Sequence, residues 1–350
     1  MFSSINFVQE KMRNSEHHVR EKPIGVLVAT ARPLMHIRRA PSPPIEMPSI
    51  SLHLDKHKVI SIMSTTGISV EISSLPLFTR NSLSTTFDEN GCPPDILVLC
   101  GSGTSWDDNQ LILEDDFGSA DFVEFVDLKL IIPEQPRILV AIGAFCDRFC
   151  RTVVEEAIAP IVLSLDDTGF GAEVGYDAVA QFFRELLKTQ GFSHLSQVID
   201  IFDKVKSACS KAGQSVDFIR LYSAHRAVAP PIPLQLFPGK CSVRDNHGVA
   251  SLRAVQSFRV FRQIAFEGRS PMMSQIVNSI ERNCTHTIVL LHGESGCGRT
   301  ELAAQIMLWY LDRAKLTCAL WGNCGAQSDV VHQVTLAEGI AITYRTTILL

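Results

Sequence analysis

The sequence predicts an α/β protein built from two parts, and three observations lead to this fold class. First, apolar segments typical of buried strands alternate with amphipathic helical segments over residues 23–211. Such alternation is typical of a mainly parallel sheet covered by helices on both faces. Second, a proline-dense stretch from Ala227 to Pro238 interrupts the alternation and indicates a linker. Third, residues 287–304 combine an apolar segment, a glycine-rich loop and a helix start.

The first part contains a series of apolar segments that are candidates for buried strands. Residues 1–22, which precede them, are polar and mixed in charge, and we expect a disordered tail there. Pro23 then introduces the first candidate strand. In chain order the candidates are Ile24–Ala29, Val59–Met63, Ile96–Cys100, Ile138–Ile142 and Ile161–Leu165. Continuous apolar runs of this kind are typical of strands that are buried on both faces of a sheet.

Helical patterns alternate with these strands and complete the first predicted domain. Apolar residues recur at helical spacing in three segments: Asp147–Ala159, Tyr176–Thr189 and Ser196–Lys211. The first of them stops at Pro160, which cannot continue a helix. We therefore predict a first domain over residues 23–211, a linker with a helical spacer over residues 212–265, and a second domain over residues 266–350.

Composition and charge exclude several classes of function. Apolar residues make up 46% of the 350 residues and charged residues 20%, which is typical of a globular chain with sizeable cores. The net charge of −5 argues against a general nucleic-acid binder. No apolar run reaches membrane-spanning length, and the N-terminus has no continuous apolar region of a secretory signal. The ten cysteines lack paired metal-ligand spacing, so we expect reduced thiols and a cytoplasmic location.

A glycine-rich loop over Gly293–Thr300 is the most informative motif in the sequence. Its glycines allow successive backbone N–H groups to turn inward and form an anion-binding nest. The helix predicted to begin near Arg299 directs its positive dipole end to the same place. The hydroxyl of Thr300 is suited to bind Mg²⁺. The candidate nucleotide-binding residues are Gly293, Glu294, Ser295, Gly296, Cys297, Gly298, Arg299, Thr300 and Glu301.

This pattern is that of the phosphate-binding loop of P-loop NTPases, with one departure. Arg299 stands where a lysine is expected. Arginine keeps the charge, but its planar, forked and bulkier head does not replace a compact ammonium group neutrally. The loop therefore predicts ATP or ADP with Mg²⁺ as the ligand, bound more weakly than a lysine would allow, and it favours binding over efficient hydrolysis. The alternative is a glycine-rich turn that binds no ligand.

The first part resembles the CHAT domain, a caspase-like cysteine peptidase fold, over somewhat more than half of the chain. The resemblance rests on Val26–Pro33, Pro93–Gly103, Gln110–Gly118, Arg137–Cys146 and Gln181–Leu187. It implies a three-layer α/β/α sandwich. It also implies that the strand ending at Gly103 carries the catalytic histidine and that the strand ending near Cys146 carries the nucleophile.

The resemblance fails at the catalytic base. Ser102 occupies the histidine position, and serine cannot take the proton of a thiol near neutral pH. Cys146 aligns with the nucleophile but has lost its activating partner. We therefore expect a catalytically degenerate pseudo-peptidase in which Cys146 is a small apolar residue at a strand end. An active cysteine endopeptidase that acts through Cys146 is the alternative.

The last quarter of the chain resembles the opening of STAND-type signalling ATPases of the AAA class. Phe266–Arg269 is similar to their aromatic-x-Gly-Arg turn, and Cys318–Cys324 to their second strand. The resemblance implies that Phe266, Gly268 and Arg269 lie on the adenine side of the nucleotide. We find no acidic residue after a strand beyond Thr300, so we expect only the opening part of such a module.

Together these features favour a signalling or scaffold protein in which a degenerate CHAT-like domain is joined to a nucleotide-dependent switch. Protein partners are expected, and neither a nucleic acid nor a membrane is. One alternative is an enzyme, either a peptidase through Cys146 or an ATP hydrolase through the glycine loop. The other is a ligand-free protein-interaction module in which both sites are relics.

Overall fold

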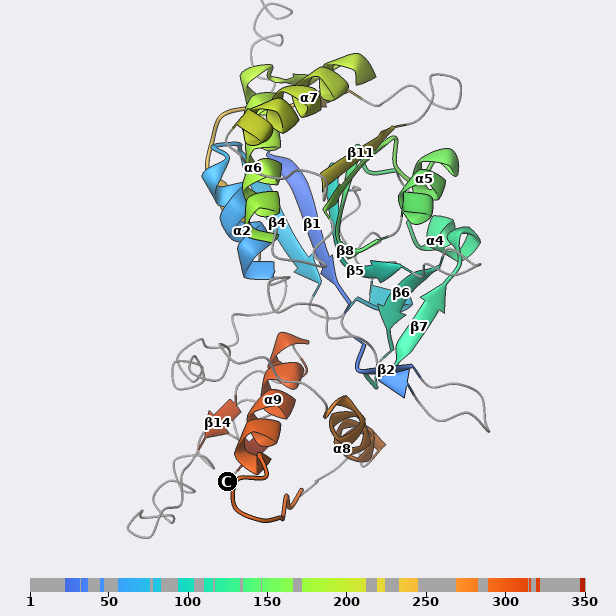
Figure 1. Ribbon diagram of the computed structural model, residues 1–350, viewed down its shortest axis with the longest axis vertical. Coiled ribbons are helices and arrows are strands. Elements are labelled where there is room, and N and C mark those ends of the chain that lie inside the picture. Colours follow the sequence, from blue (N-terminus) through green and yellow to red (C-terminus); the bar gives the residue numbers. More distant parts are fainter. Residues whose placement is uncertain are drawn as a thin grey trace, which may run out of the picture.

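The structure of the protein is a computed structural model (Figure 1). It describes residues 23–36, 45–46, 56–82, 94–103, 110–165, 172–211, 219–223, 233–244, 269–282, 289–315, 319–321 and 347–349, apart from single positions at 32, 76, 77, 116, 133, 134, 146 and 314. The tail expected over residues 1–22 and the helical spacer expected over residues 246–263 lie outside the described residues.

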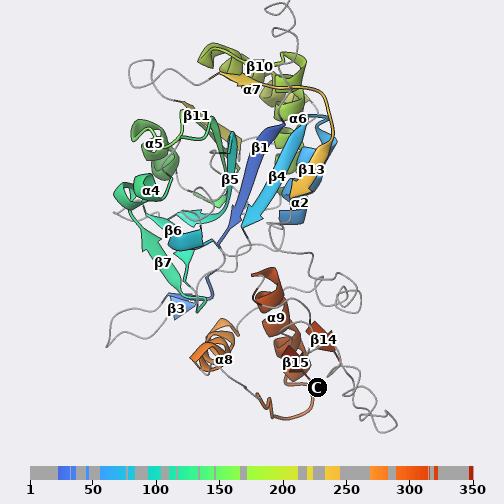
Figure 2. The same ribbon diagram turned by 180° about the vertical axis from the view of Figure 1, so that it is seen from behind.

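A mainly parallel sheet forms the centre of the first part (Figures 1 and 2). Its order is β11-β9-β8-β5-β1-β4-β13, in which all neighbours are parallel except β11 and β9. The strands are β1 (Ile24–Thr30), β4 (Val70–Leu75), β5 (Ile96–Gly103), β8 (Ile138–Ala144), β9 (Ile161–Leu165), β11 (Ile219–Ser223) and β13 (Cys241–Arg244). The predicted α/β class is therefore confirmed, and four of the five predicted strands lie where the apolar runs placed them.

Helices cover both faces of this sheet and divide its apolar residues between two cores. On one face pack α2 (Lys56–Thr65), α6 (Ala172–Lys188) and α7 (Leu195–Lys211), and on the other α4 (Phe125–Ile131) and α5 (Asp147–Glu155). Side chains of a strand alternate between faces, so Val26 and Val28 belong to the first core, and Leu27 and Ala29 to the second. Burial on both faces explains why the strand sequences are continuously apolar.

The segment Val59–Met63, predicted as a strand, is helical in the structure and lies within α2. A short apolar run fits a buried helix as well as a strand. The strand beside β1 is instead β4, whose burial alternates more than that of the central strands. Gly67 separates the two elements with a φ of 75°, a conformation typical of the glycine that ends a helix. Met63 then packs into the first core with 2% exposure.

The sheet also continues into the range predicted to be a linker. β11 pairs with β9, and β13 pairs with β4, so residues beyond 211 form both edges of the sheet. A third short strand, β12 (Leu234–Gln235), pairs with β10 (Gly191–Phe192). Unpaired strand edges leave backbone groups without partners, so edge pairing is a physical reason for these short segments to return to the first domain.

A hairpin branches from the carboxyl end of β5. It consists of β6 (Leu111–Glu114) and β7 (Ala120–Val123), and β6 pairs with the last residues of β5. The turn is closed by Asp115 Oδ1, which accepts hydrogen bonds from the N–H groups of Phe117 (2.9 Å) and Ser119 (2.7 Å). Close to this hairpin lies a second short pair, β2 (Met35–His36) with β3 (Ile45–Glu46) (Figure 1).

The second part lies at the carboxyl edge of the sheet, below β7 in Figures 1 and 2. Its helices α8 (Ser270–Arg282) and α9 (Arg299–Asp312) share one apolar cluster, and we name residues 269–315 the α8–α9 module. Nearby, β14 (Ala319–Trp321) pairs in parallel with β15 (Thr347–Leu349). Within the described residues, no helix combines the length and apolar character that a membrane crossing requires.

The strand predicted to precede the glycine loop is not observed where the structure describes it. Residues 283–288 lie outside the described residues, and Val289–His292 form no strand. Leu290 is 81% exposed rather than buried. A single apolar segment becomes a strand only beside a partner strand, and the described strands of this part pair with each other instead.

Candidate functional sites

The strand ends that carry Ser102 and precede Cys146 are neighbours in the sheet. Ser102 in β5 pairs with Ala144 in β8, and on its other side with Ile112 in β6. Because β5 and β8 are parallel, both strands end at the same edge. Cys146 lies outside the described residues, two positions after Ala144. The topology therefore brings Ser102 and Ala144 to the same edge of the sheet.

A glycine in β8 allows these strand ends to approach closely. Gly143 in β8 has a φ of 127°, and a Cβ atom at this position would lie 2.1 Å from the carbonyl oxygen of Gly101 in β5. No side chain fits in that space, so the sequence Ile142-Gly143-Ala144 has a steric reason for its glycine. The edge next to Ser102 is therefore held in a tight backbone arrangement.

A network of polar groups anchors the helix that begins directly after Cys146. Asp147, the first residue of α5, accepts hydrogen bonds from the hydroxyl of Tyr222 and the guanidinium of Arg220, both on β11. Arg151, one turn further along α5, also contacts it at 3.2 Å. The hydrogen bond from Tyr222 is the main reason why the pKa of Asp147 is lowered, with Arg220 and Arg151 adding to it. Burial raises the pKa of Tyr222, and its bond to Asp147 raises it further.

This arrangement ties α5 to the sheet rather than presenting a free acid or base. Each group of the network already has a partner, and the carboxylate of Asp147 is kept ionised. His194 does not supply the missing base either, because it follows α6, which returns the chain to the opposite edge of the sheet. The described residues at the carboxyl edge thus hold no histidine side chain in the place of Ser102.

Two glycines of the glycine loop adopt a left-handed backbone conformation, and a helix begins directly after the loop. Gly296 and Gly298 have φ values of 81° and 79°, in the region that favours glycine. The N–H of Cys297 donates to the carbonyl oxygen of Glu294 at 3.2 Å and closes a turn. Helix α9 begins at Arg299, and the N–H of Leu302 donates to Gly298 O at 3.0 Å. The free N–H groups of the first helical turn therefore follow the loop directly.

Arg269 joins this loop from a distant point in the sequence. Its Nη2 donates to the carbonyl oxygen of Cys297, and its guanidinium lies next to Gly298. Two arginines, Arg269 and Arg299, thus flank the same loop. Of the three residues that the family resemblance places on the adenine side, Arg269 is brought to the loop, whereas Phe266 and Gly268 lie outside the described residues.

Gly293 packs against the side chain of Cys297. A Cβ atom at Gly293 would lie 2.8 Å from Cys297 Sγ, closer than real Cβ contacts allow. Thr300 and most of the loop residues before it are exposed, and Arg299 is half-buried. Among the described residues there is no group of three histidine, cysteine or carboxylate side chains placed to hold a metal ion.

One buried ion pair was not foreseen from the sequence. Glu114 at the end of β6 and Arg313 after α9 meet with side chains that are 1% and 8% exposed. The signal in the sequence is weak, namely a carboxylate that ends the apolar run Leu111-Ile112-Leu113. A buried carboxylate requires a partner, but the sequence does not say which one.

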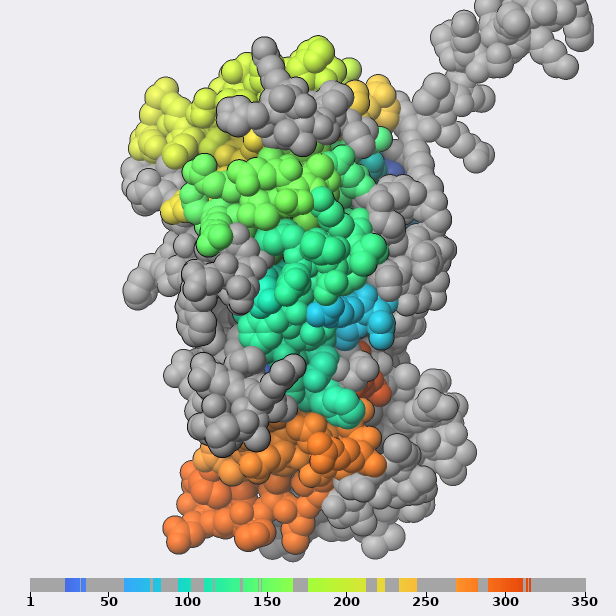
Figure 3. Space-filling model, turned by 90° about the vertical axis from the view of Figure 1, so that its right-hand side faces the viewer, coloured from blue at the N-terminus to red at the C-terminus, as the bar shows by residue number. Residues whose placement is uncertain are grey.

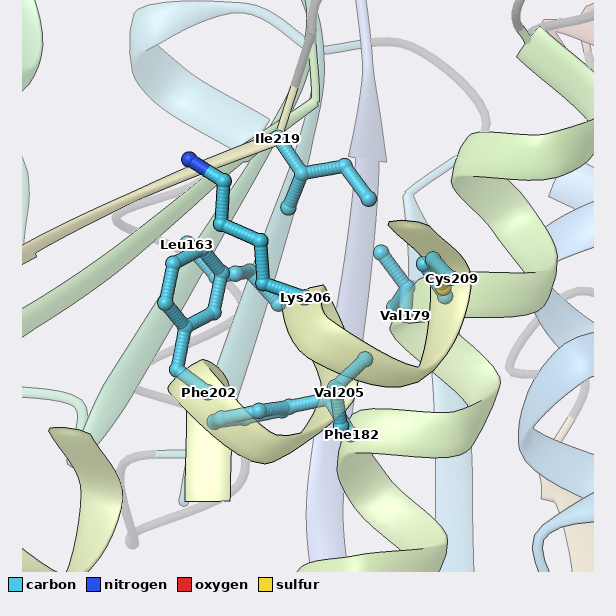
Figure 4. A pocket seen from close by; sticks show the side chains of 9 residues that line it. Leu163, Val179, Phe182, Phe202, Val205, Lys206, Cys209 and Ile219 are labelled. Atoms are coloured by element: carbon cyan, nitrogen blue, oxygen red, sulfur yellow. The ribbon is translucent and has the colours of Figure 1, made fainter. Parts of the chain in front are cut away.

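A small hollow between α6, α7 and the sheet is lined mainly by apolar side chains (Figure 4). Its lining residues are Leu163, Ala178, Val179, Phe182, Phe202, Val205, Lys206, Cys209 and Ile219. Lys206 contributes its carbon chain and carries its amine away from the lining. With a narrow apolar lining and a single charged head outside it, this hollow is a packing gap of the first core rather than a ligand site.

Comparisons with known proteins give no family for this chain. No protein-family model matches the sequence, and the search of curated proteins found no match. Among solved structures, the crystal structure of the C-terminal domain of the coenzyme A biosynthesis bifunctional protein CoaBC is similar over 44% of this chain and 79% of that chain. The identity is 12% and the TM-score 0.26, a level at which the likeness carries no argument about this chain.

Proposed function

We propose that this protein is a nucleotide-binding signalling or scaffold protein in which a degenerate CHAT-like domain is coupled to a STAND-type phosphate loop. The observation that carries the proposal is the arrangement at α9. Positive-φ glycines, the free N–H groups of a helix start and the guanidinium of Arg269 converge on one loop. Backbone donors and guanidinium groups together favour a phosphate-bearing anion.

In this proposal the first domain provides a surface at the sheet edge of Ser102 and Ala144 and has no catalytic centre. The pairing of Ser102 with Ala144 supports the caspase-like arrangement, because base and nucleophile positions occupy adjacent strand ends. Serine at position 102 cannot act as the base, so the domain serves as a scaffold or effector surface. A cytoplasmic location is part of this proposal, because the spacing of the cysteines in the sequence predicts reduced thiols.

The chemistry at the loop is binding and positioning. ATP or ADP with Mg²⁺ would place its phosphates against the N–H groups of Gly296–Thr300, and the Thr300 hydroxyl would bind the metal ion. Arg299 and Arg269 would neutralise phosphate charge as guanidinium groups. No residue is assigned to activate a water molecule, so this proposal does not include rapid hydrolysis.

Calorimetric titration of the full chain with Mg²⁺-ATP and Mg²⁺-ADP tests the proposal. We expect binding that is abolished in Gly298→Ala and weakened at least about tenfold in Thr300→Ala. Arg299→Lys is expected to bind about tenfold more tightly than the natural chain, since a compact ammonium fits the phosphate cradle better.

Two matched variants control for damage that has nothing to do with the loop. Gly67→Ala introduces a side chain at a φ of 75°, close to the 79° of Gly298, but at the end of α2. Ser207→Ala removes an exposed hydroxyl from α7. Both should bind nucleotide normally. If the natural chain and Arg299→Lys bind no nucleotide at millimolar concentration, the proposal of a nucleotide-dependent switch is wrong. That result would favour the alternative of a ligand-free protein-interaction module. Labelling of Cys146 by a thiol-directed peptide probe, or peptide cleavage, would instead favour the peptidase alternative.

A further inference from the structure

The α8–α9 module is attached to the first domain by a buried, bidentate ion pair. Arg313 Nε donates to Glu114 Oε1 at 2.6 Å, and Arg313 Nη2 donates to Glu114 Oε2 at 2.8 Å. The third nitrogen, Nη1, donates to the carbonyl oxygen of Trp309 at 3.1 Å. Two parallel N–H···O bonds fix both the distance and the orientation of the two side chains. This contact therefore sets how the helix α9 lies on the hairpin.

The indole ring of Trp309 packs against the ion pair. The guanidinium carbon of Arg313 lies 4.2 Å from the centre of the indole ring. The ring also packs against Gly118, where a Cβ atom would lie 3.0 Å from Trp309 Cζ2, and it belongs to an apolar cluster against which Leu34 packs. Leu34 and Gly118 are themselves joined by a backbone hydrogen bond of 2.7 Å. In Figure 3 the orange surface of the module adjoins the blue-green surface above it.

The composition of this contact makes it suited to reversible docking. A carboxylate and a guanidinium are costly to bury unless they remain paired, but both are well solvated once they are separated. An interface built only of apolar side chains would instead expose an apolar patch on opening, and such patches promote aggregation. Interfaces between domains of one chain are generally more polar than obligate interfaces, and a buried ion pair fits that description.

The position of the pair connects the two candidate sites. Helix α9 has 14 residues, which corresponds to about 20 Å, with the glycine loop at its start and Arg313 directly after its end. At the other side of the contact, Glu114 lies on β6 two residues after Ile112, which pairs with Ser102. One helix therefore connects the glycine loop to the β6–β7 hairpin, and a movement at the loop can be transmitted to the hairpin and to the sheet edge at Ser102.

The contacts of Arg269 indicate whether a phosphate at the glycine loop tightens or loosens the contact between the module and the first domain. It donates to Cys297 O in the loop and immediately precedes α8, whose Met273 and Val277 share the apolar cluster with Trp309. A bound phosphate competes with the carbonyl oxygen of Cys297 for the guanidinium of Arg269. Because Arg269 immediately precedes α8, its withdrawal from Cys297 would remove the hydrogen bond that joins the start of α8 to the glycine loop.

We propose that the Glu114–Arg313 pair is a latch that holds the α8–α9 module on the β6–β7 hairpin, and that nucleotide phosphate at the glycine loop opens it. The opening step rests on the proposed function. The latch itself does not, because it is formed by residues outside the loop.

The latch is tested first without nucleotide, in the full chain. Trp106→Phe and Trp321→Phe leave Trp309 as the single tryptophan, so its emission reports docking. Glu114→Gln should shift this emission to longer wavelength and accelerate amide exchange at residues 111–123, while β1 and β8 stay protected. The apolar pair Glu114→Leu with Arg313→Met should restore both readings, because it removes both charges and keeps the volume.

A matched substitution in an exposed ion pair provides the control. Lys129 and Glu156 lie 2.7 Å apart with side chains that are 47% and 49% exposed. Glu156→Gln should change neither the emission nor the exchange. The latch is refuted if Glu114→Gln behaves like Glu156→Gln, or if it exposes β1 and β8 to the same extent as the hairpin.

Nucleotide is then added to separate the two proposals. Mg²⁺-ATP should shift the Trp309 emission of the natural latch, and Glu114→Gln should bind the nucleotide about tenfold more tightly, because binding and opening are reciprocal. Binding with no emission shift and no gain in affinity would refute the coupling and leave the proposed function intact. Absence of binding in every variant would refute the proposed function and the coupling with it, whereas the first experiment decides the latch on its own.

Discussion

Replacing the two members of the Glu114–Arg313 pair, singly and together, has a predictable effect on the free energy of unfolding. Arg313→Met removes both hydrogen bonds that Arg313 donates to a carboxylate that is 1% exposed. Loss of one partner from a buried pair costs about 3–5 kcal/mol. Glu114→Leu leaves the guanidinium of Arg313 without the same two acceptors, and we expect a loss of similar size. The double variant should lose less than about 1 kcal/mol, since apolar replacements of similar volume are tolerated.

The coupling energy of this cycle follows from these values. If the single losses are about 3–5 kcal/mol each and the double loss is small, the two sites are coupled by about 5 kcal/mol or more. Urea titration of the full chain, followed by Trp309 emission, measures the unfolding of the module. The exposed pair of Lys129 and Glu156 should give a coupling below about 1 kcal/mol in the same cycle. Additive losses at Glu114 and Arg313 would refute the reasoning, because additivity means that the two side chains do not depend on each other.

Three further predictions concern the first domain. Asp147→Asn should destabilise it by less than about 1 kcal/mol, because the carboxylate is 44% exposed and screened by solvent. The pKa of Asp147 is lowered in the folded state. The stability difference between the natural chain and Asp147→Asn is therefore present above the ordinary pKa of 3.8, and it is lost as the pH falls through the lower pKa of the folded state. Urea titrations at pH 7 and pH 2 compare the two conditions. Phe149→Ala, at a fully buried ring 5.1 Å from that of Phe145, should cost about 3–5 kcal/mol by thermal or chemical unfolding, whereas Val126→Ala at a 70% exposed position should change stability by less than about 0.5 kcal/mol. Gly143→Ala should prevent β5 and β8 from pairing at their carboxyl ends, and a normal exchange pattern of β8 amides in this variant would contradict the close approach to Gly101.

Much of the central sheet was predictable because its middle strands are buried on both faces. Ile96–Cys100, Ile138–Ile142 and Ile161–Leu165 all lie within observed strands, and their continuous apolar character is a direct result of that position. The edge strands were not predictable in the same way. β4 and β13 contain polar residues on their less buried positions, and no local pattern says that residues 241–244 return to pair with Val70–Ser73.

The wrong strand assignment at Val59–Met63 has a related cause. A run of apolar residues records burial but not backbone conformation, and its length fits either a strand or part of a helix. The glycine that ends this helix, Gly67, is the signal in the sequence that favoured the helix.

Among the candidate sites, too, contacts between residues that are close in the sequence were predictable and contacts between distant residues were not. The glycine loop was predictable because its residues are adjacent in the chain and each glycine serves a local turn. The family resemblance implied that Arg269 lies on the adenine side of a nucleotide, but nothing in the sequence predicted its hydrogen bond to the carbonyl oxygen of Cys297. The Glu114–Arg313 pair joins residues 199 positions apart, and pattern analysis does not identify partners at such a separation.

The return of β13 to the sheet also determines what kind of equilibrium the latch obeys. β13 runs parallel to β4 and ends at Arg244, so the chain leaves the sheet at the same carboxyl edge on which the module is docked. Residues 245–268 then connect it to α8, and their contour length limits the separation to about 80 Å whatever their conformation. An undocked module therefore remains at an effective concentration that is limited by the length of this connecting segment. Opening and closing are unimolecular, so the fraction of open molecules is independent of protein concentration, and a module added in trans must exceed that local concentration to compete.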